Sequence, residues 1–160
     1  MMANTVKPIP EGYHTLTPYV VVRNAELAID FYKCAFGATE KYRMKSPDGK
    51  LVAHAELMIG DSPLMLSDEL CKESKSAETL KGSPVGFYLY VSDVDQSFKK
   101  AIDAGASEEN AIADMFWGDR SGTLIDPFGN HWTIATHRED LSSEEIEKRG
   151  KEFFKKMQAA

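Results

Sequence analysis

Two stretches of the chain share one order of apolar and polar positions. In the first, the apolar run 19–22 is followed by Asn24 and then by apolar residues at helical spacing. In the second, the apolar run 88–91 is followed by Asp93 and a similar helical pattern. The predicted core-facing helix residues are Ala28, Phe31, Tyr32 and Ala35 in the first stretch and Val94, Phe98, Ala101 and Ile102 in the second. This repetition indicates an internal duplication of one structural module.

The two predicted helices have recognisable ends. Asn24 and Asp93 are predicted N-caps, because their side chains can accept hydrogen bonds from the free amides of the first turn. Gly37 and Gly105 follow the helical patterns, where a residue tolerant of positive φ is favoured. Cys34 falls on the first helix, and we expect it to be a small packing residue.

Strand patterns follow each predicted helix. In the first module they cover 40–44, 51–59 and 64–67, separated by turns rich in Gly, Pro and Asp. In the second module they cover 121–125 and 131–136, on either side of a turn that contains Pro and Gly. With the duplication, these patterns predict a strand, a helix and three further strands in each module, of which the second module shows ranges for only two after its helix.

This order predicts a single α+β domain that spans residues 1–160. Its expected parts are module one at about 14–69, a polar linker at about 70–83, module two at about 84–137 and a final helix at about 143–158. A sheet covered by a helix on one face needs a partner for the other face. Two such sheets facing each other would form a partly open mixed-sheet barrel, and its cavity is the expected ligand site.

The predicted final helix carries an apolar stripe made of Ile146, Phe153, Phe154 and Met157. If this helix does not fold back on its own sheet, the stripe forms an exposed apolar face. Faces of this kind mark interaction sites, so we expect a homodimer that covers the stripe.

Composition and charge limit the function classes. Apolar residues make up 42% of the chain and charged residues 28%, which is typical of a globular protein. The net charge of -6 argues against nucleic-acid binding, which needs clustered Lys and Arg. No apolar run approaches the roughly 18 residues of a membrane span, and residues 1–12 lack the layout of a secretion signal. We expect a cytoplasmic protein without a membrane partner.

Three motifs open the first module: TPYVVV at 17–22, AIDFY at 28–32 and FGA at 36–38. They resemble the vicinal oxygen chelate superfamily, which comprises glyoxalases, bleomycin resistance proteins and dioxygenases. The motifs that resemble its PhnB-like branch are PDG at 47–49, HAEL at 54–57, GD at 60–61, MLSD at 65–68, MFWGDR at 115–120 and DPFGNHW at 126–132. The resemblance covers about residues 16–146 and implies the paired-module fold of that superfamily.

The resemblance also implies where a metal would be bound. Family enzymes of the glyoxalase and fosfomycin-resistance kinds place His or Glu on the first and last strands of each module, around one divalent metal. The matching positions in this chain are Thr17, Met65 or Leu66, Gly86 or Phe87, and Thr133. None of these is a usual metal ligand. A true glyoxalase reaction is therefore not expected, and the cofactor remains open between a divalent metal in a nonstandard site and none.

His54 and Glu56 are the first candidate site. They lie two residues apart on a predicted strand and therefore on the same face. They could act as a catalytic base with its orienting partner, or as two ligands of a nonstandard metal site. The alternative is a hydrogen-bonded polar pair without catalytic function.

Aromatic residues and an arginine form a second set of candidates. Trp117, Arg120 and Trp132 would suit a planar or anionic ligand, because a guanidinium offers forked donors and indoles offer stacking surface. The alternative is structural, with an Asp119–Arg120 pair and Trp132 in the core. The opening strands add ligand-binding candidates with hydroxyl tips: Tyr19, Tyr88 and Tyr90.

Two functions follow from these candidates. The first is a metal-assisted enzyme of isomerase, lyase or dioxygenase type that binds a small oxygenated or phosphonate-like molecule in the cavity and uses a site involving His54 and Glu56. The second is metal-free sequestration of a small molecule, as in antibiotic resistance. A methyltransferase is not expected, because no glycine-rich strand-to-helix loop is present to hold a nucleoside cofactor.

Overall fold

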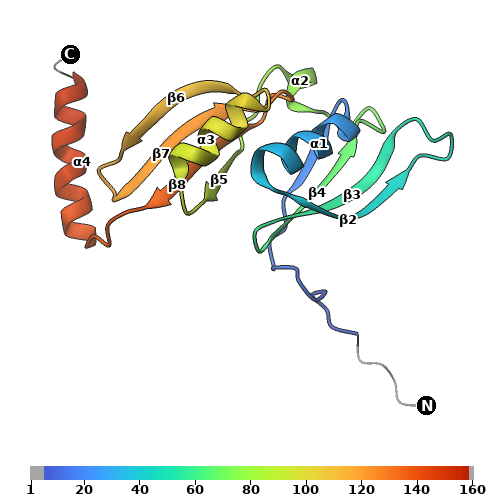
Figure 1. Cartoon of the computed structure of the whole chain (residues 1–160), viewed down its shortest axis with the longest axis horizontal. Helices are drawn as coiled ribbons and strands as arrows, with labels where there is room; N and C mark the ends of the chain where they lie inside the picture. The colour runs from blue at the N-terminus through green and yellow to red at the C-terminus, as the bar shows by residue number, and fades with distance from the viewer. Residues whose placement is uncertain (1–5, 159–160) are drawn as a thin grey trace. The chain divides into compact units, whose positions relative to one another are not determined.

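The structure is a computed structural model that describes residues 6–158 (Figure 1). The chain divides into two compact units between Gly82 and Ser83. Each unit contains a four-stranded mixed sheet and a helix that packs against it. The predicted α+β fold made of two β-α-β-β-β modules is confirmed.

The first unit begins its regular structure at β1. Its elements are β1 (Tyr19–Val22), α1 (Ala25–Phe36), β2 (Thr39–Lys45), β3 (Val52–Ile59), β4 (Ser62–Asp68) and the short α2 (Ala77–Leu80). The strands are arranged in the order β1-β4-β3-β2, with β1 parallel to β4 and the other pairs antiparallel.

The second unit repeats this arrangement. Its elements are β5 (Gly86–Tyr90), α3 (Val94–Asp103), β6 (Ser107–Asp114), β7 (Asp119–Ile125), β8 (His131–His137) and α4 (Ser143–Gln158). The strand order is β5-β8-β7-β6, with β5 parallel to β8 and the other pairs antiparallel. The duplication seen in the sequence is therefore a duplication of topology.

The predicted helix starts are present in both units, whereas α3 ends at the C-cap Ala104, one residue before Gly105. The Asn24 side chain accepts a hydrogen bond from the amide of Leu27, and Asp93 accepts one from Gln96. Gly37 has a φ of 67° and ends α1 in the left-handed conformation that glycine tolerates.

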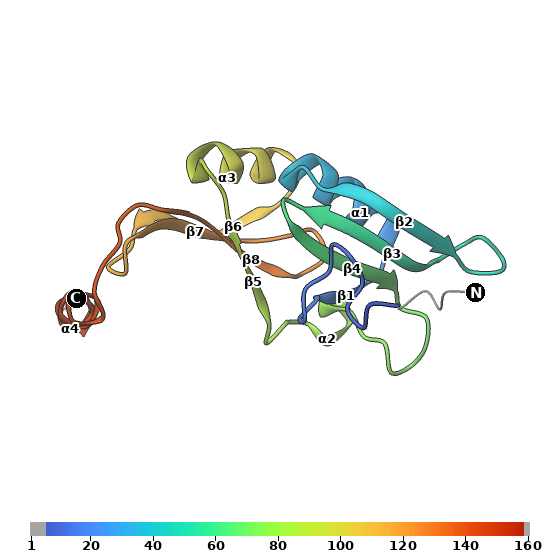
Figure 2. The ribbon, with the colours of Figure 1, turned by 90° about the horizontal axis from the view of Figure 1, so that it is seen from below.

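Helices α1 and α3 each cover one face of their own sheet (Figure 2). In the first unit, buried residues of α1 such as Ile29 and Tyr32 share the core with Val22, Leu57 and Leu66. Because strand side chains alternate, the neighbouring positions point to the opposite face. We call this second face of each sheet its open face.

Three details differ from the sequence prediction. Strand β6 was not assigned a range, because its residues are mostly polar and exposed and give no alternating pattern. The polar linker contains α2, which begins after the N-cap Ser76. The expectation that Cys34 is a packing residue is wrong, because its side chain is exposed on the outer side of α1.

Helix α4 packs against the turn between β6 and β7. The Phe116 ring in that turn lies 5.4 Å from the ring of Phe153 and 5.9 Å from that of Phe154, measured between centroids. Gly150 is buried beside the same ring. Phe153, Phe154 and Met157 nevertheless stay 41%, 55% and 62% exposed. Within residues 6–158, no helix has the length and apolar character needed to cross a membrane.

Candidate functional site

The open face of the first sheet carries a hydrogen-bonded chain of three side chains. His54 Nε2 lies 3.1 Å from Glu56 Oε1. The Tyr13 hydroxyl donates a hydrogen bond to the other oxygen, Glu56 Oε2. Tyr13 comes from the segment before β1, so this segment is tied to β3 at the centre of the sheet. The predicted pair of His54 and Glu56 is thus joined by a third residue that sequence reasoning missed.

Glu56 is the charged centre of this chain. Hydrogen bonds from Tyr13 and then from His54 hold the pKa of its carboxyl below the usual range, against the opposing effect of burial. The same bond to Glu56, together with burial, raises the pKa of Tyr13 to about 12. At neutral pH the site therefore holds an ionised carboxylate and a neutral phenol that donates to it.

Aromatic rings surround His54 on the same face. The Tyr19 ring stacks on the imidazole at a centroid distance of 5.7 Å and an interplanar angle of 30°. The Tyr42 ring, on the neighbouring strand β2, lies 6.4 Å from the imidazole between centroids. Tyr19 and Tyr42 are 50% and 51% exposed. The face therefore presents accessible ring surface around a negative charge.

Strand register explains why these residues meet. Tyr19 in β1 pairs with Met65 in β4, Met65 pairs with Glu56 in β3, and Glu56 pairs with Tyr42 in β2. One row across the sheet thus holds two tyrosines, a methionine and the carboxylate. His54 lies two residues before Glu56, so it faces the same side in the next row.

The open face of the second sheet is organised by Asp119, which is only 3% exposed. The hydroxyls of Tyr88 and Tyr90 each donate to its Oδ2 atom at 2.9 Å. The indole N–H of Trp117 donates to the same oxygen at 3.2 Å. His137 Nδ1 lies 2.8 Å from the other oxygen, Oδ1. A single buried carboxylate therefore fixes two tyrosines, a tryptophan and a histidine.

The protonation states in this Asp119 cluster follow from these contacts. Burial alone would raise the pKa of the Asp119 carboxyl, but the hydrogen bonds from His137, Tyr88, Tyr90 and Trp117 outweigh it and lower the pKa. Hydrogen bonding to Asp119 raises the pKa of Tyr90 to about 12, and burial with the same partner raises that of Tyr88. Bonds to Asp119 and then to Asp140 raise the pKa of His137.

The predicted set of Trp117, Arg120 and Trp132 has three different environments. Arg120 makes a forked contact with Asp95 of α3 at 2.8 and 2.9 Å and reaches Asp114 at 3.2 Å. The alternative of an Asp119–Arg120 pair is wrong, because both residues have other partners. Trp132 is 3% exposed and donates to Asp126 at 3.0 Å.

The positions that hold a metal in family enzymes carry no ligand side chains here. The Thr17 hydroxyl lies 3.4 Å from the carbonyl oxygen of His14. The Thr133 hydroxyl lies 3.1 Å from the Thr123 hydroxyl. Gly86 has no side chain. Among the described residues of each unit, no three or more His, Cys, Asp or Glu side chains are grouped to hold a metal ion. His54 and Glu56 alone fall short of the about three protein ligands that metal sites use.

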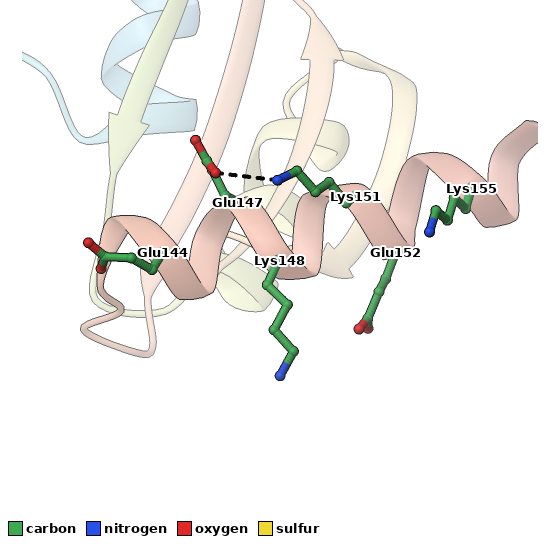
Figure 3. A pocket seen from close by; sticks show the side chains of 6 residues that line it. All are labelled: Glu144, Glu147, Lys148, Lys151, Glu152 and Lys155. Carbon is green, nitrogen blue, oxygen red and sulfur yellow. Dashed lines mark ion pairs between the residues drawn. The ribbon is translucent and has the colours of Figure 1, made fainter.

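A shallow groove of about 350 Å³ runs along the outer side of α4 (Figure 3). It is lined only by charged residues of this helix: Glu144, Glu147, Lys148, Lys151, Glu152 and Lys155. Glu147 and Lys151 form an ion pair at 3.5 Å. Side chains of alternating charge on a single helix form a solvated surface. The groove offers no apolar surface from a second element and is not a ligand site.

Comparison with known proteins identifies the family. The model of the Glyoxalase/Bleomycin resistance protein/Dioxygenase superfamily matches residues 13–134. The uncharacterized protein Mb0911c of Mycobacterium bovis is 41% identical over 150 residues, which cover 91% of this chain and 94% of that protein.

Solved structures agree with this match. The product of the Arabidopsis thaliana gene At5g48480 has a TM-score of 0.62 and 30% identity, and the alignment covers 77% of this chain and 98% of that one. The PhnB protein of Bacillus cereus shares the fold, with a TM-score of 0.61, 14% identity, and coverage of 77% and 99%. The chain therefore belongs to the glyoxalase/bleomycin resistance protein/dioxygenase superfamily.

Proposed function

We propose that the chain binds a small molecule with a planar ring on the open face of the first sheet. The observation that carries this proposal is the placement of Tyr19, Tyr42 and His54 around the ionised Glu56. The two tyrosine rings are about half exposed, so their surfaces are available for stacking. Aromatic surface combined with a few fixed polar groups is typical of small-molecule sites.

Sequestration without turnover is the form of this function that the geometry supports best. His54 and Glu56 are only two donors, which does not fit a resident metal ion with about three protein ligands. Arg120 and Trp132, which could have contacted an anionic ligand, are already bonded to Asp95, Asp114 and Asp126. The rings of Tyr19 and Tyr42 in the first sheet remain accessible for stacking.

Metal-free acid–base catalysis is the second candidate, and the Tyr13–Glu56–His54 chain favours it. A carboxylate bonded to one imidazole nitrogen orients the ring. If Nε2 donates to Glu56, the lone pair on Nδ1 of His54 can accept a proton from a bound molecule. The chemistry would then be of the isomerase or lyase type.

Nuclear magnetic resonance tests the binding proposal. A panel of planar aromatic compounds is titrated into the labelled protein, and we expect amide shifts in β1, β2 and β3. Tyr42→Ala should weaken the binding about three- to tenfold, because it removes one stacking ring. Leu70→Ala removes an exposed side chain outside the sheet and is the control. Shifts confined to other elements, or equal effects of the two variants, would contradict the proposal.

Glu56→Gln separates binding from catalysis, because it keeps the shape and removes the charge. If the second candidate holds, turnover of the bound compound should fall about 10²- to 10⁴-fold with an unchanged circular dichroism spectrum. Parent-like turnover in this variant would exclude that candidate. Methylglyoxal–glutathione isomerisation should be undetectable in the parent, and stoichiometric metal in protein purified without added metal would contradict the metal-free form.

A further inference from the structure

The hydroxyl hydrogens of Tyr88 and Tyr90 are both committed to one acceptor. Each hydroxyl lies 2.9 Å from Asp119 Oδ2, and an ionised carboxylate only accepts hydrogen bonds. A phenol has a single hydrogen, so neither tyrosine has one left to donate. What remains on each phenol oxygen is therefore acceptor capacity. The oxygen of Tyr88 also interacts with Trp117 and Ser121, whereas Tyr90 is 60% exposed and can accept a hydrogen bond from a ligand.

Asp119 itself is shielded from direct contact with a ligand. A carboxylate has about four lone-pair sites. Its Oδ2 atom receives three donors, from Tyr88, Tyr90 and Trp117, its Oδ1 atom contacts His137, and the residue is only 3% exposed. A ligand therefore meets the two phenol oxygens, behind which the charge of Asp119 lies.

The charge of the cluster stays negative in either protonation state of His137. Its Nε2 atom lies 3.0 Å from Asp140 Oδ1, while its Nδ1 atom contacts Asp119. One imidazolium between two carboxylates leaves one negative charge uncompensated. Within residues 6–158, no Lys or Arg forms an ion pair with Asp119.

The two rings add a surface that suits a cation. Their centroids lie 5.1 Å apart at an interplanar angle of 47°, so the two ring planes are tilted relative to each other. Tyr88 and Tyr90 are 46% and 60% exposed. A cation above a tyrosine face is attracted by the ring quadrupole.

We propose that Tyr88 and Tyr90, held by Asp119, form a binding site for the N–H-bearing cationic group of a small molecule, such as a protonated amine or amidine. Acceptor-only oxygens select for a group that donates hydrogen bonds. The buried carboxylate and the ring faces select for positive charge. The site lies within the second unit and does not depend on binding in the first.

Four benzyl compounds of similar size test the selectivity: benzylammonium, benzyltrimethylammonium, benzyl alcohol and benzoate. Dissociation constants are measured from amide shifts in β5 and β8. Benzylammonium should bind most tightly, benzyltrimethylammonium should be weaker because it lacks N–H donors, and benzoate should not bind. Equal affinity for all four, tighter binding of benzoate, or benzylammonium shifts confined to the first unit would overturn the proposal.

Two kinds of variant test the residues. Tyr90→Phe keeps the ring and removes the acceptor oxygen, and we expect about three- to tenfold weaker benzylammonium binding from the loss of one hydrogen bond. Asp119→Asn should abolish the preference for benzylammonium over benzyl alcohol. Asp103→Asn, at an exposed acid of α3, is the charge-matched control and should bind as the parent does. If Asp119→Asn does not fold, the benzylammonium affinities of Tyr88→Phe and Tyr90→Phe test the proposal instead. Parent-like affinity in both variants would overturn it.

Discussion

Asp68 and Thr136 occupy matching places in the two units, where each accepts a hydrogen bond from the first amide of the helix that covers its sheet. Asp68 Oδ1 lies 2.9 Å from the amide nitrogen of Ala25, and Thr136 Oγ1 lies 2.9 Å from that of Val94. Asp68 also accepts from the amide of Val52 at 2.7 Å, at the start of β3. A side chain at the end of the last strand thus ties helix to sheet in both modules.

We expect Asp68→Ala to destabilise the protein by about 3 kcal/mol, because two buried amides lose a charged acceptor. Thr136→Ala should cost less, about 1–2 kcal/mol, because it removes a neutral partner. The measurement is the free energy of unfolding from urea titrations. Asp30→Ala, at an exposed position of α1, should stay within about 0.5 kcal/mol of the parent. An equally small change in Asp68→Ala would show that this link contributes nothing to stability.

Gly118 cannot accept a side chain without moving its neighbour. It has a φ of +100°, and an added Cβ would lie 2.5 Å from the backbone oxygen of Glu139. We expect Gly118→Ala to cost about 3 kcal/mol from the combined backbone strain and collision. Gly49 also has a positive φ, of +73°, but open space around it. Gly49→Ala should therefore cost only about 1–2 kcal/mol of unfolding free energy. Equal losses in both variants would show that the collision with Glu139 adds nothing to the backbone strain.

His137 should make part of the stability depend on pH. Its pKa is raised in the folded state by Asp119 and then Asp140, above the about 6.5 of an unfolded chain. Its contribution is thus complete below about pH 6.5 and is lost as pH rises through the folded pKa. The loss of melting temperature in His137→Gln should be larger at about pH 5.5 than at about pH 9. Asp140→Asn should shrink that difference, and a pH-independent loss would contradict the assignment.

We still expect a homodimer, because the apolar side of α4 is only partly covered. Phe116 covers only part of it, and Phe154 and Met157 are more than half exposed. Light scattering at micromolar concentration should give the mass of a dimer. Phe154→Glu should shift it to a monomer, whereas Lys155→Gln on the charged side should not. A monomeric parent protein would defeat the prediction.

The elements that carry clear local signals could be predicted from the sequence. Asn24 and Asp93 marked the helix starts, and Gly37 marked the end of α1, because each acts on backbone groups within a few residues. Strand β6 lacked such a signal, since it is an edge strand with exposed polar residues on both faces. Its pairing with β7, rather than its composition, makes it a strand.

The candidate sites were predictable only in part, because they depend on strand register. His54 and Glu56 lie two residues apart, so their shared face followed from periodicity. Asp119 meets Tyr88 and Tyr90 across 31 and 29 residues of sequence, and Tyr13 meets Glu56 across 43. The alternation of Tyr88 and Tyr90 signalled a polar-tipped aromatic face, but nothing near them in sequence indicated the shared acceptor.

The parallel pairing of first and last strands also bears on how each unit is made. Hairpins β2–β3 and β3–β4 join segments that are adjacent in sequence. Strand β1 can pair only after β4 has formed. The hydrogen bond between Ala25 and Asp68 likewise joins residues 43 positions apart. Non-local contacts of this kind form late, because the intervening loop must close first. On the ribosome, β1 and α1 would emerge before β4, the strand that pairs with β1. In the second unit, β5 would likewise emerge before its partner β8. Because the module is duplicated, an unpaired first strand is exposed twice during synthesis of the chain.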